Sequence, residues 1–160
     1  MAKRFWLFKS EPDSFSINDL ADLPNQTTSW EGVRNYQSRS SLRDDVQVGD
    51  CVFFHHSSAN PPGLAGTCEI TRAGYPDATA CDPAGKYFDS KSTDENPRWY
   101  TVDVKLVEKF AELIPLSTQK ETPGLENMMV GQRGSRLSIQ PVTADQWQVV
   151  MRLAKCLFQK

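Results

Sequence analysis

The segment Trp99–Val107 constrains the fold more than any other part of the chain. Its side chains alternate between apolar and polar, and this two-residue period predicts a β-strand with one buried face. A second β-forming run, Cys51–His56, is followed by the turn sequence Asn60–Gly63 and a returning run at 64–73. These runs predict a sheet that includes an antiparallel hairpin.

Shorter elements are expected on both sides of this hairpin. Ser16 with Asp19, and Thr143 with Gln146, have the spacing of helix capping boxes. The remaining expected elements are strands at Phe5–Phe8 and Leu137–Ile139, a helix from Tyr36 to about Arg43, and an apolar-faced helix after Thr143. Helices inserted between four or five strands predict an α+β domain around a small, curved or barrel-like sheet.

The length and charge of the chain limit its organisation and its partners. A chain of 160 residues suits a single domain, expected to span residues 1–160. The 18 Lys and Arg residues against 20 Asp and Glu residues give a formal net charge of −2. Proteins that bind nucleic acid mainly by neutralising phosphates are usually basic. Any nucleic-acid role must therefore depend on a local patch and a pocket.

Membrane, secretory and metal-binding classes have no support in the sequence. The longest uncharged stretch, Cys51–Cys68, contains histidine, serine, asparagine and proline, so it cannot be a membrane span. The apolar run Phe5–Phe8 is too short for a signal peptide, and a cytoplasmic protein without a membrane partner is expected. The four cysteines form no C-x-x-C pair, and adjacent His55 and His56 on a strand would point to opposite faces. No metal or cofactor is expected.

Motifs of common enzyme classes do not occur in the sequence. It contains no G-x-x-x-x-G-K-[ST], G-x-G-x-x-G or G-x-S-x-G string, so nucleotide-triphosphate, dinucleotide and hydrolase-elbow functions have no motif support. A non-enzymatic role is expected, with no catalytic residue assigned.

Trp30 is the aromatic residue that is hardest to place in a periodic core. It follows five polar residues and is separated from Gly32 by a single glutamate. One interpretation is a loop tryptophan that plugs one end of the core. The other is a pocket wall that stacks on a planar base, an interaction worth about 1–3 kcal/mol. Trp99, at the start of an alternating strand, has more core character.

Two groups of arginines are candidates for contacts with phosphate. Arg34, Arg39 and Arg43 can share part of a helix surface, which is either a solvated face or a phosphate-binding stripe. Arg133 and Arg136 lie in a glycine-flanked segment that is either a surface turn or a further phosphate contact.

Several short motifs occur in an order that resembles one family, the EVE domain. They are Lys9-Ser10-Glu11-Pro12, Trp30 to Gln37, Phe54-His55-His56-Ser57, Gly63-Leu64-Ala65-Gly66, Tyr75-Pro76-Asp77, Asn96-Pro97-Arg98-Trp99 with Val102-Asp103, and Arg136 to Pro141. The resemblance covers nearly the whole chain. The family's common Phe-Tyr-His-Ser string is here Phe54-His55-His56-Ser57, so the residue at position 55 departs from the pattern.

The resemblance implies a fold and a function. The fold is a PUA-like β-pseudobarrel of about five or six strands wrapped by helices. The function is non-catalytic recognition of a modified nucleobase of the 5-methylcytosine type or a related one, in DNA or RNA, flipped out or single-stranded. Separately from the resemblance, a monomer is expected. The implied base-pocket residues are Lys9, Ser10, Glu11, Trp30, Val33, Asn35, His56, Ser57 and Trp99. The expected phosphate contacts are Arg34, Arg39, Arg43, Arg133 and Arg136.

Two alternatives to non-catalytic recognition of a modified base stay open. Related PUA-like domains include small amidohydrolases that use a lysine, a hydroxyl and a glutamate, and Lys9, Ser10 and Glu11 supply these groups. Adjacent strand residues alternate between faces, so the three can converge only at a bulge or a turn. The last alternative is an interaction module with a vestigial pocket.

Overall fold

The computed structural model describes residues 3–30, 33, 35–57, 59, 61–93, 95–131 and 137–158. It has the predicted α+β architecture. The strands are β1 (Phe5–Ser10), β2 (Thr27–Ser29), β3 (Cys51–His56), β4 (Gly63–Pro76), β5 (Tyr100–Pro115) and β6 (Ile139–Val142). The helices are α1 (Ile17–Ala21), α2 (Tyr36–Ser40), α3 (Leu116–Glu121) and α4 (Ala144–Phe158), and the short helical turns are η1 (Pro24–Gln26), η2 (Ser41–Asp45), η3 (Ala78–Cys81) and η4 (Met129–Gly131).

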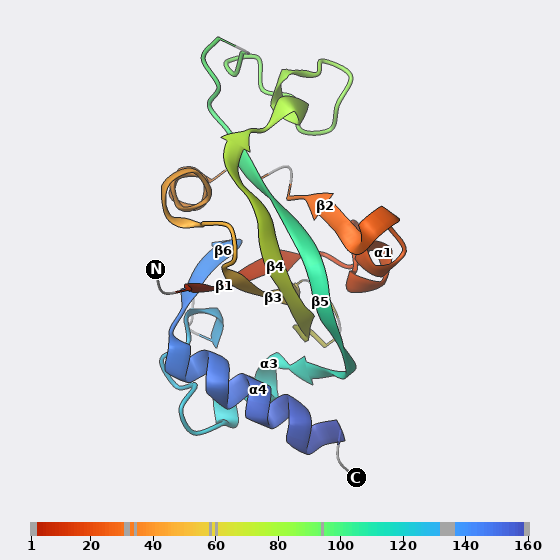
Figure 1. Ribbon diagram of the computed structural model, residues 1–160, viewed down its shortest axis with the longest axis vertical. Helices are drawn as coiled ribbons and strands as arrows, with labels where there is room; N and C mark the ends of the chain where they lie inside the picture. The colour runs from red at the N-terminus through yellow and green to blue at the C-terminus, as the bar shows by residue number, and fades with distance from the viewer. Residues whose placement is uncertain are drawn as a thin grey trace.

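The six strands form one mixed sheet in the order β2-β5-β4-β3-β1-β6 (Figure 1). Strands β1 and β3 are parallel, and the other neighbouring pairs are antiparallel. The sheet is strongly twisted but not closed, because the strand order ends at β2 on one side and at β6 on the other. The connection 77–99 extends beyond one end of the β4–β5 ladder, at the top of Figure 1.

The predicted hairpin is confirmed as the antiparallel pair β3–β4, and β4 and the next strand, β5, are longer than the sequence pattern indicates. The β4–β5 ladder runs from Gly63 opposite Pro115 to Pro76 opposite Tyr100, with several register shifts. These bulges interrupt the alternation of side chains, which is why the predicted strands ended too early. The N-terminal strand likewise continues past Phe8 to Ser10.

The two edge strands were predicted poorly. Strand β2 was not predicted, and it is only three residues long and half-buried. Strand β6 was expected at Leu137–Ile139, whereas it begins at Ile139 and includes Pro141. Proline is tolerated there because an edge strand leaves the N–H position on one side unpaired.

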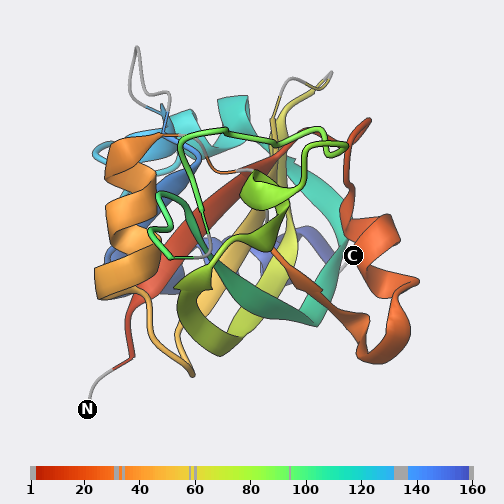
Figure 2. The same cartoon turned by 90° about the horizontal axis from the view of Figure 1, so that it is seen from above.

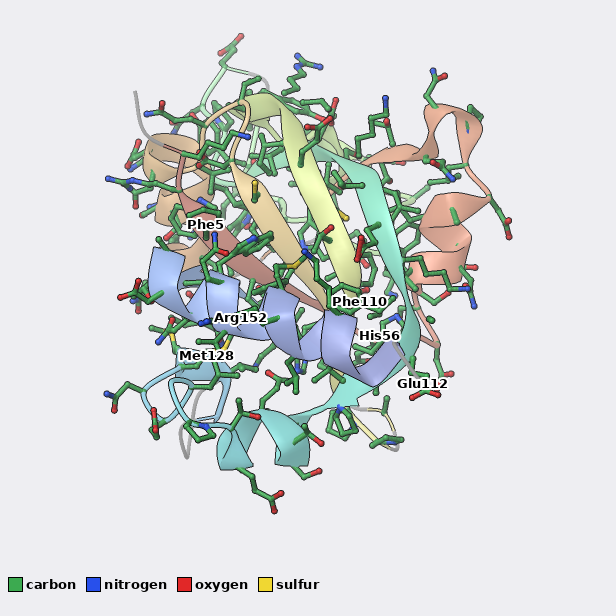
Figure 3. The ribbon with its side chains drawn as sticks, turned by 60° about the horizontal axis from the view of Figure 1, so that its bottom comes forward. Phe5, His56, Phe110, Glu112, Met128 and Arg152 are labelled. Carbon is green, nitrogen blue, oxygen red and sulfur yellow. The ribbon has the colours of Figure 1, made fainter. Side chains whose placement is uncertain are left out.

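Apolar side chains cover both faces of the sheet. On one face, Ile17 and Leu20 of α1 and Leu42 of η2 pack against Phe8 and Phe54. On the other face, α4 and the segment before it complete a second core. Its members include Leu7, Phe53, Leu64, Ile114, Met128, Trp147, Val150 and Ala154. Figure 3 shows α4 lying across the strands, with Phe5 on one side of its N-terminal half and Met128 on the other.

The four-turn helix α4 begins as the sequence predicts. The Thr143 hydroxyl accepts a hydrogen bond from the Gln146 amide at 3.1 Å, and the Gln146 side chain accepts one from the Thr143 amide at 3.0 Å. The ring of Trp147 stacks on Phe53 with a centroid distance of 3.9 Å. At fifteen residues, α4 is the longest of the helices given above, and none in the described ranges combines the length and apolarity needed to cross a bilayer.

His55 lies inside the core that α4 covers. It shares a face of β3 with Phe53, only 2% of its surface is exposed, and neither ring nitrogen has a hydrogen-bond partner among the described residues. Burial, together with the nearby positive charges of Lys9 and His56, lowers the pKa of His55 to about 4. The protonated form is therefore disfavoured in the folded protein.

We expect this histidine to make folding sensitive to acid. Between pH 6.5 and pH 4 the unfolded chain binds the proton at residue 55 and the folded chain does not, so the free energy of unfolding falls as the pH falls, by up to about 3 kcal/mol. In His55→Phe this part of the loss is absent. Denaturant unfolding at pH 7 and pH 4 measures it, with the exposed-site variant Val107→Ala as the control that keeps the full loss. An equal loss in His55→Phe and the wild type would contradict the assignment.

Candidate functional site

A cavity of about 510 Å³ opens at the C-terminal end of β1. This volume lies within the range of about 300–1,000 Å³ that is typical of small-ligand pockets. The cavity collects residues from the end of β1, the turn before α1, strand β2 and its continuation, the 77–99 connection and the approach to β6. They are Lys9, Ser10, Glu11, Ser14, Phe15, Thr28, Ser29, Trp30, Val33, Lys86, Tyr87 and Ser138.

Trp30 forms an aromatic wall of the cavity and is also part of the core. Its ring centroid is 5.3 Å from that of Phe8 and 5.3 Å from that of Phe54, the latter in an edge-on arrangement. Its backbone amide donates to the Val102 carbonyl at 2.8 Å, and its carbonyl accepts the Thr101 hydroxyl at 2.6 Å. The two interpretations of Trp30 are thus not exclusive: 8% of the residue is exposed, and it borders the cavity.

The cavity is bordered by three consecutive polar residues, Lys9, Ser10 and Glu11, because the chain turns directly after them. The amides of Ser14 and Phe15 both donate to the Glu11 carbonyl, at 2.9 and 2.8 Å. This turn supplies the change of direction without which neighbouring strand residues would face opposite sides. The Ser10 hydroxyl donates to the Phe15 carbonyl at 2.6 Å. Burial lowers the pKa of Lys9.

A hydrogen-bond network supports the β2 wall. Ser29 lies opposite Asp103 in the β2–β5 ladder. The Tyr75 hydroxyl donates to the Asp103 carboxylate and also hydrogen bonds with Ser29. The guanidinium of Arg72 lies 3.7 Å from the centre of the Tyr75 ring. Burial, followed by the hydrogen bond to Asp103, raises the pKa of Tyr75, so the phenol stays protonated and holds the strand in place.

The 77–99 connection supplies Lys86 and Tyr87 on another side of the cavity. Figure 2 shows this connection lying over the end of the sheet, between the helical segment α2–η2 on the left and α1 on the right. The adjoining residues of the connection, 86–90, line a shallow groove. A long connection between two paired strands therefore returns over the sheet and completes the site.

Four of the expected pocket residues are not among those that line the cavity. Asn35 is exposed and caps α2, with its side chain accepting from the Ser38 amide at 3.0 Å. The His56 Nε2 accepts from the Ile17 amide at 3.1 Å, and burial lowers the His56 pKa. The Ser57 amide donates to the Ser10 carbonyl at 2.9 Å. The Trp99 indole N–H donates to Asp89 at 2.6 Å.

These contacts act on the cavity indirectly. His56 holds the first residue of α1 against β3, next to the turn that carries Ser14 and Phe15. Ser57 continues the pairing of β1 with the chain after β3. Both residues therefore position segments that border the cavity.

The structure describes two of the three arginines of the predicted stripe, Arg39 and Arg43. The Arg39 guanidinium donates to the Arg98 carbonyl at 3.2 Å. Arg43 makes a two-pronged ion pair with Asp44, with N–O distances of 2.9 Å, and this contact raises the Arg43 pKa. The predicted helix to Arg43 continues in the π conformation from Ser41. Arg34, Arg133 and Arg136 lie outside the described residues.

Seven cavity residues were missed in the sequence: Ser14, Phe15, Thr28, Ser29, Lys86, Tyr87 and Ser138. Thr28 and Ser29 directly precede Trp30, so proximity to a candidate wall was an available signal. Lys86 and Tyr87 lie in a long connection without periodicity, and no local pattern marks them.

The chemistry of the cavity fits a flat, partly polar ligand. An indole and the apolar side chains of Phe15 and Val33 face hydroxyl, ammonium and carboxylate-bearing residues. Across the described parts of the chain, no cluster of three or more His, Cys, Asp or Glu residues could hold a metal ion. The fold and the site together define an α+β domain with an aromatic-walled cavity at the end of its sheet.

Comparison with known proteins identifies the family. The model of the EVE domain matches residues 4–153, and the chain belongs to the EVE domain family. Thymocyte nuclear protein 1 of Gallus gallus is 44% identical over 165 residues, which cover 92% of this chain and 67% of that protein.

Solved structures agree with this assignment. A crystal structure of a Pseudomonas putida protein superposes with a TM-score of 0.89 at 48% identity, covering 94% of this chain and 99% of the other. Human THYN1 protein, crystallised in complex with DNA containing 5-methylcytosine, has a TM-score of 0.88 at 39% identity, covering 96% of this chain and 98% of that chain.

We expect His56→Ala to loosen α1 without unfolding the protein. The substitution leaves the partly buried backbone amide of Ile17 without its hydrogen-bond acceptor, which lowers the free energy of unfolding by about 1–3 kcal/mol. Amide hydrogen exchange should become faster at Ile17 and in the turn before it, while Val107→Ala, as the control, leaves these amides protected. Unchanged protection of Ile17 in His56→Ala would show that this hydrogen bond does not hold the helix.

Proposed function

We propose that this protein is a monomeric, non-catalytic reader of a 5-methylcytosine-type base in DNA, which it binds as an extruded base in the Trp30 cavity. The observation that carries the proposal is an indole wall, fixed by the core, beside a 510 Å³ cavity with polar residues around it. The complex of the human relative with DNA containing 5-methylcytosine supports this choice of ligand over other planar groups.

The proposed mechanism begins with removal of the base from its stack. A base can be read on its edges only when it is flipped out or already single-stranded, and extrusion costs a few kcal/mol. Stacking on Trp30 offsets part of this cost, by about 1–3 kcal/mol. Because Phe8 and Phe54 hold the indole in place, no side-chain entropy needs to be lost there on binding.

Polar groups around the cavity would then select the base by its hydrogen-bonding edge. We assign this role to Lys9, Ser10, Glu11 and Ser29, with Phe15 and Val33 as the apolar surfaces that receive a methyl group. Burial of one methyl contributes about 0.8 kcal/mol, which corresponds to about a fourfold preference. A larger preference would require a tight enclosure around the methyl group.

The arrangement of Ser10 argues against the hydrolase alternative. Lys9, Ser10 and Glu11 all border the cavity, and the lowered pKa of Lys9 is a property that a general base needs. However, the Ser10 hydroxyl donates its proton to the Phe15 carbonyl, which cannot act as a base. A nucleophilic serine needs a neighbouring group that accepts its proton, so this geometry favours binding over hydrolysis.

Trp30 is a poor position for a simple alanine test. Because Trp30 packs on two core phenylalanines and is only 8% exposed, its truncation should lower the free energy of unfolding by about 3–5 kcal/mol. A cleaner test fills the cavity from its exposed side.

We expect Ser14→Phe to block the site while leaving the core unchanged. Ser14 borders the cavity and is exposed, so the added ring occupies ligand space. The wild type should bind an oligonucleotide with one 5-methylcytosine at least about fourfold more tightly than its unmodified counterpart. Fluorescence anisotropy at fixed salt should show this preference lost in Ser14→Phe.

Ser117→Phe is the matched control, because Ser117 is exposed on α3 and does not line the cavity. It should keep the wild-type affinity and preference. A panel with hydroxymethylated cytosine and with RNA of the same sequence separates DNA from RNA and one modification from another. Equal wild-type affinity for every member of the panel would refute the reader and favour a module with a vestigial pocket. Conversion of a modified nucleoside, detected by mass, would instead establish the hydrolase.

A further inference from the structure

An exposed aromatic ring outside the proposed base pocket is connected to that pocket through Trp99 and the segment 86–90. Tyr36, the first residue of α2, is 50% exposed, and its ring stacks on the buried Trp99 at a centroid distance of 5.0 Å and an interplanar angle of 22°. The guanidinium carbons of Arg39 and Arg98 lie 4.9 and 5.5 Å from the centre of the Tyr36 ring. We call Tyr36, Arg39, Arg98 and Trp99 the Tyr36 ledge.

The ledge is tied to the segment that borders the cavity. Asp89 accepts the Trp99 indole N–H at 2.6 Å and forms an ion pair with Arg98 at 3.5 Å. Asp89 also lies in the groove lined by residues 86–90, and two residues of that groove, Lys86 and Tyr87, border the base cavity. A single short segment therefore contacts the ledge on one side and the cavity on the other.

The ledge is built rigidly and carries positive charge. Trp99 is 5% exposed and fixed by Asp89, and Arg39 donates to the Arg98 carbonyl at 3.2 Å. The ledge carries the guanidiniums of Arg39 and Arg98 against the carboxylate of Asp89, which pairs with Arg98. The protein as a whole has a formal net charge of −2, whereas the ledge itself presents two guanidiniums, which suit contact with a phosphate.

We infer that the Tyr36 ledge stacks on the nucleotide next to the extruded base and holds its phosphate. This inference rests on the proposed function. When one base leaves the stack, the neighbouring base loses a stacking partner, and an exposed aromatic ring with adjacent guanidiniums replaces that partner. Stacking on a ring does not depend on the identity of the base, so the ledge adds affinity without adding preference for the modification.

The test separates affinity from preference. Tyr36→Ala should weaken binding of methylated and unmethylated oligonucleotides equally, by at least about fivefold, and leave their affinity ratio at the wild-type value. Tyr36→Phe keeps the ring and should restore most of the affinity. Against an oligonucleotide whose nucleotides beside the 5-methylcytosine are abasic, Tyr36→Ala and the wild type should bind alike. Val48→Ala, a change at another exposed apolar residue, is the control.

The outcomes distinguish the ledge from the pocket. Wild-type affinity of Tyr36→Ala, with the methyl preference intact, overturns the ledge and leaves the reader standing. An equal loss on the abasic oligonucleotide, or a changed methyl preference in Tyr36→Ala, also overturns the ledge, because Tyr36 would then act through the pocket. A wild type without any methyl preference refutes the reader, whatever Tyr36→Ala does.

Discussion

The packing of Trp30 against Phe8 and Phe54 is the contact on which the site depends. Its backbone is held from β5 through Val102 and Thr101, and its ring closes one end of the core. The same indole borders the cavity. A wall that is rigid before the ligand arrives loses little entropy on binding, so stability and recognition share one side chain. For this reason the core and the pocket cannot be altered independently at Trp30.

The rest of the site is assembled where regular structure ends. Strand β1 ends at Ser10, β2 is a three-residue edge strand, and the 77–99 connection returns over the sheet. Such segments expose polar backbone and side chains that a core would exclude. The supporting contacts, His56 with the start of α1 and Tyr75 with Asp103, lie behind these segments and fix their positions. The apolar cores on the two faces of the sheet provide the rigid frame.

Local sequence patterns predicted which helices and strands form better than they predicted where these elements begin and end. The capping boxes at Ser16 and Thr143 are present, because a cap depends on residues three positions apart. The ends of β4 and β5 were missed, because bulges break the alternation. Asn35 and Trp99 carry polar groups suited to a base pocket, yet these groups bind the Ser38 amide and Asp89. A residue type reveals its bonding capacity but not its partner.

The sequence by itself determined the α+β class, the near-neutral charge that directs attention to a pocket, and the motif order typical of the EVE domain family. These properties are local or additive, and each can be read without knowing the neighbours in space. Only the tertiary structure decided which residues surround the cavity and that Tyr36 stacks on Trp99, 63 positions away in the chain (36 to 99). Such proximity arises from strand pairing and the path of a long connection, and no spacing along the chain encodes it.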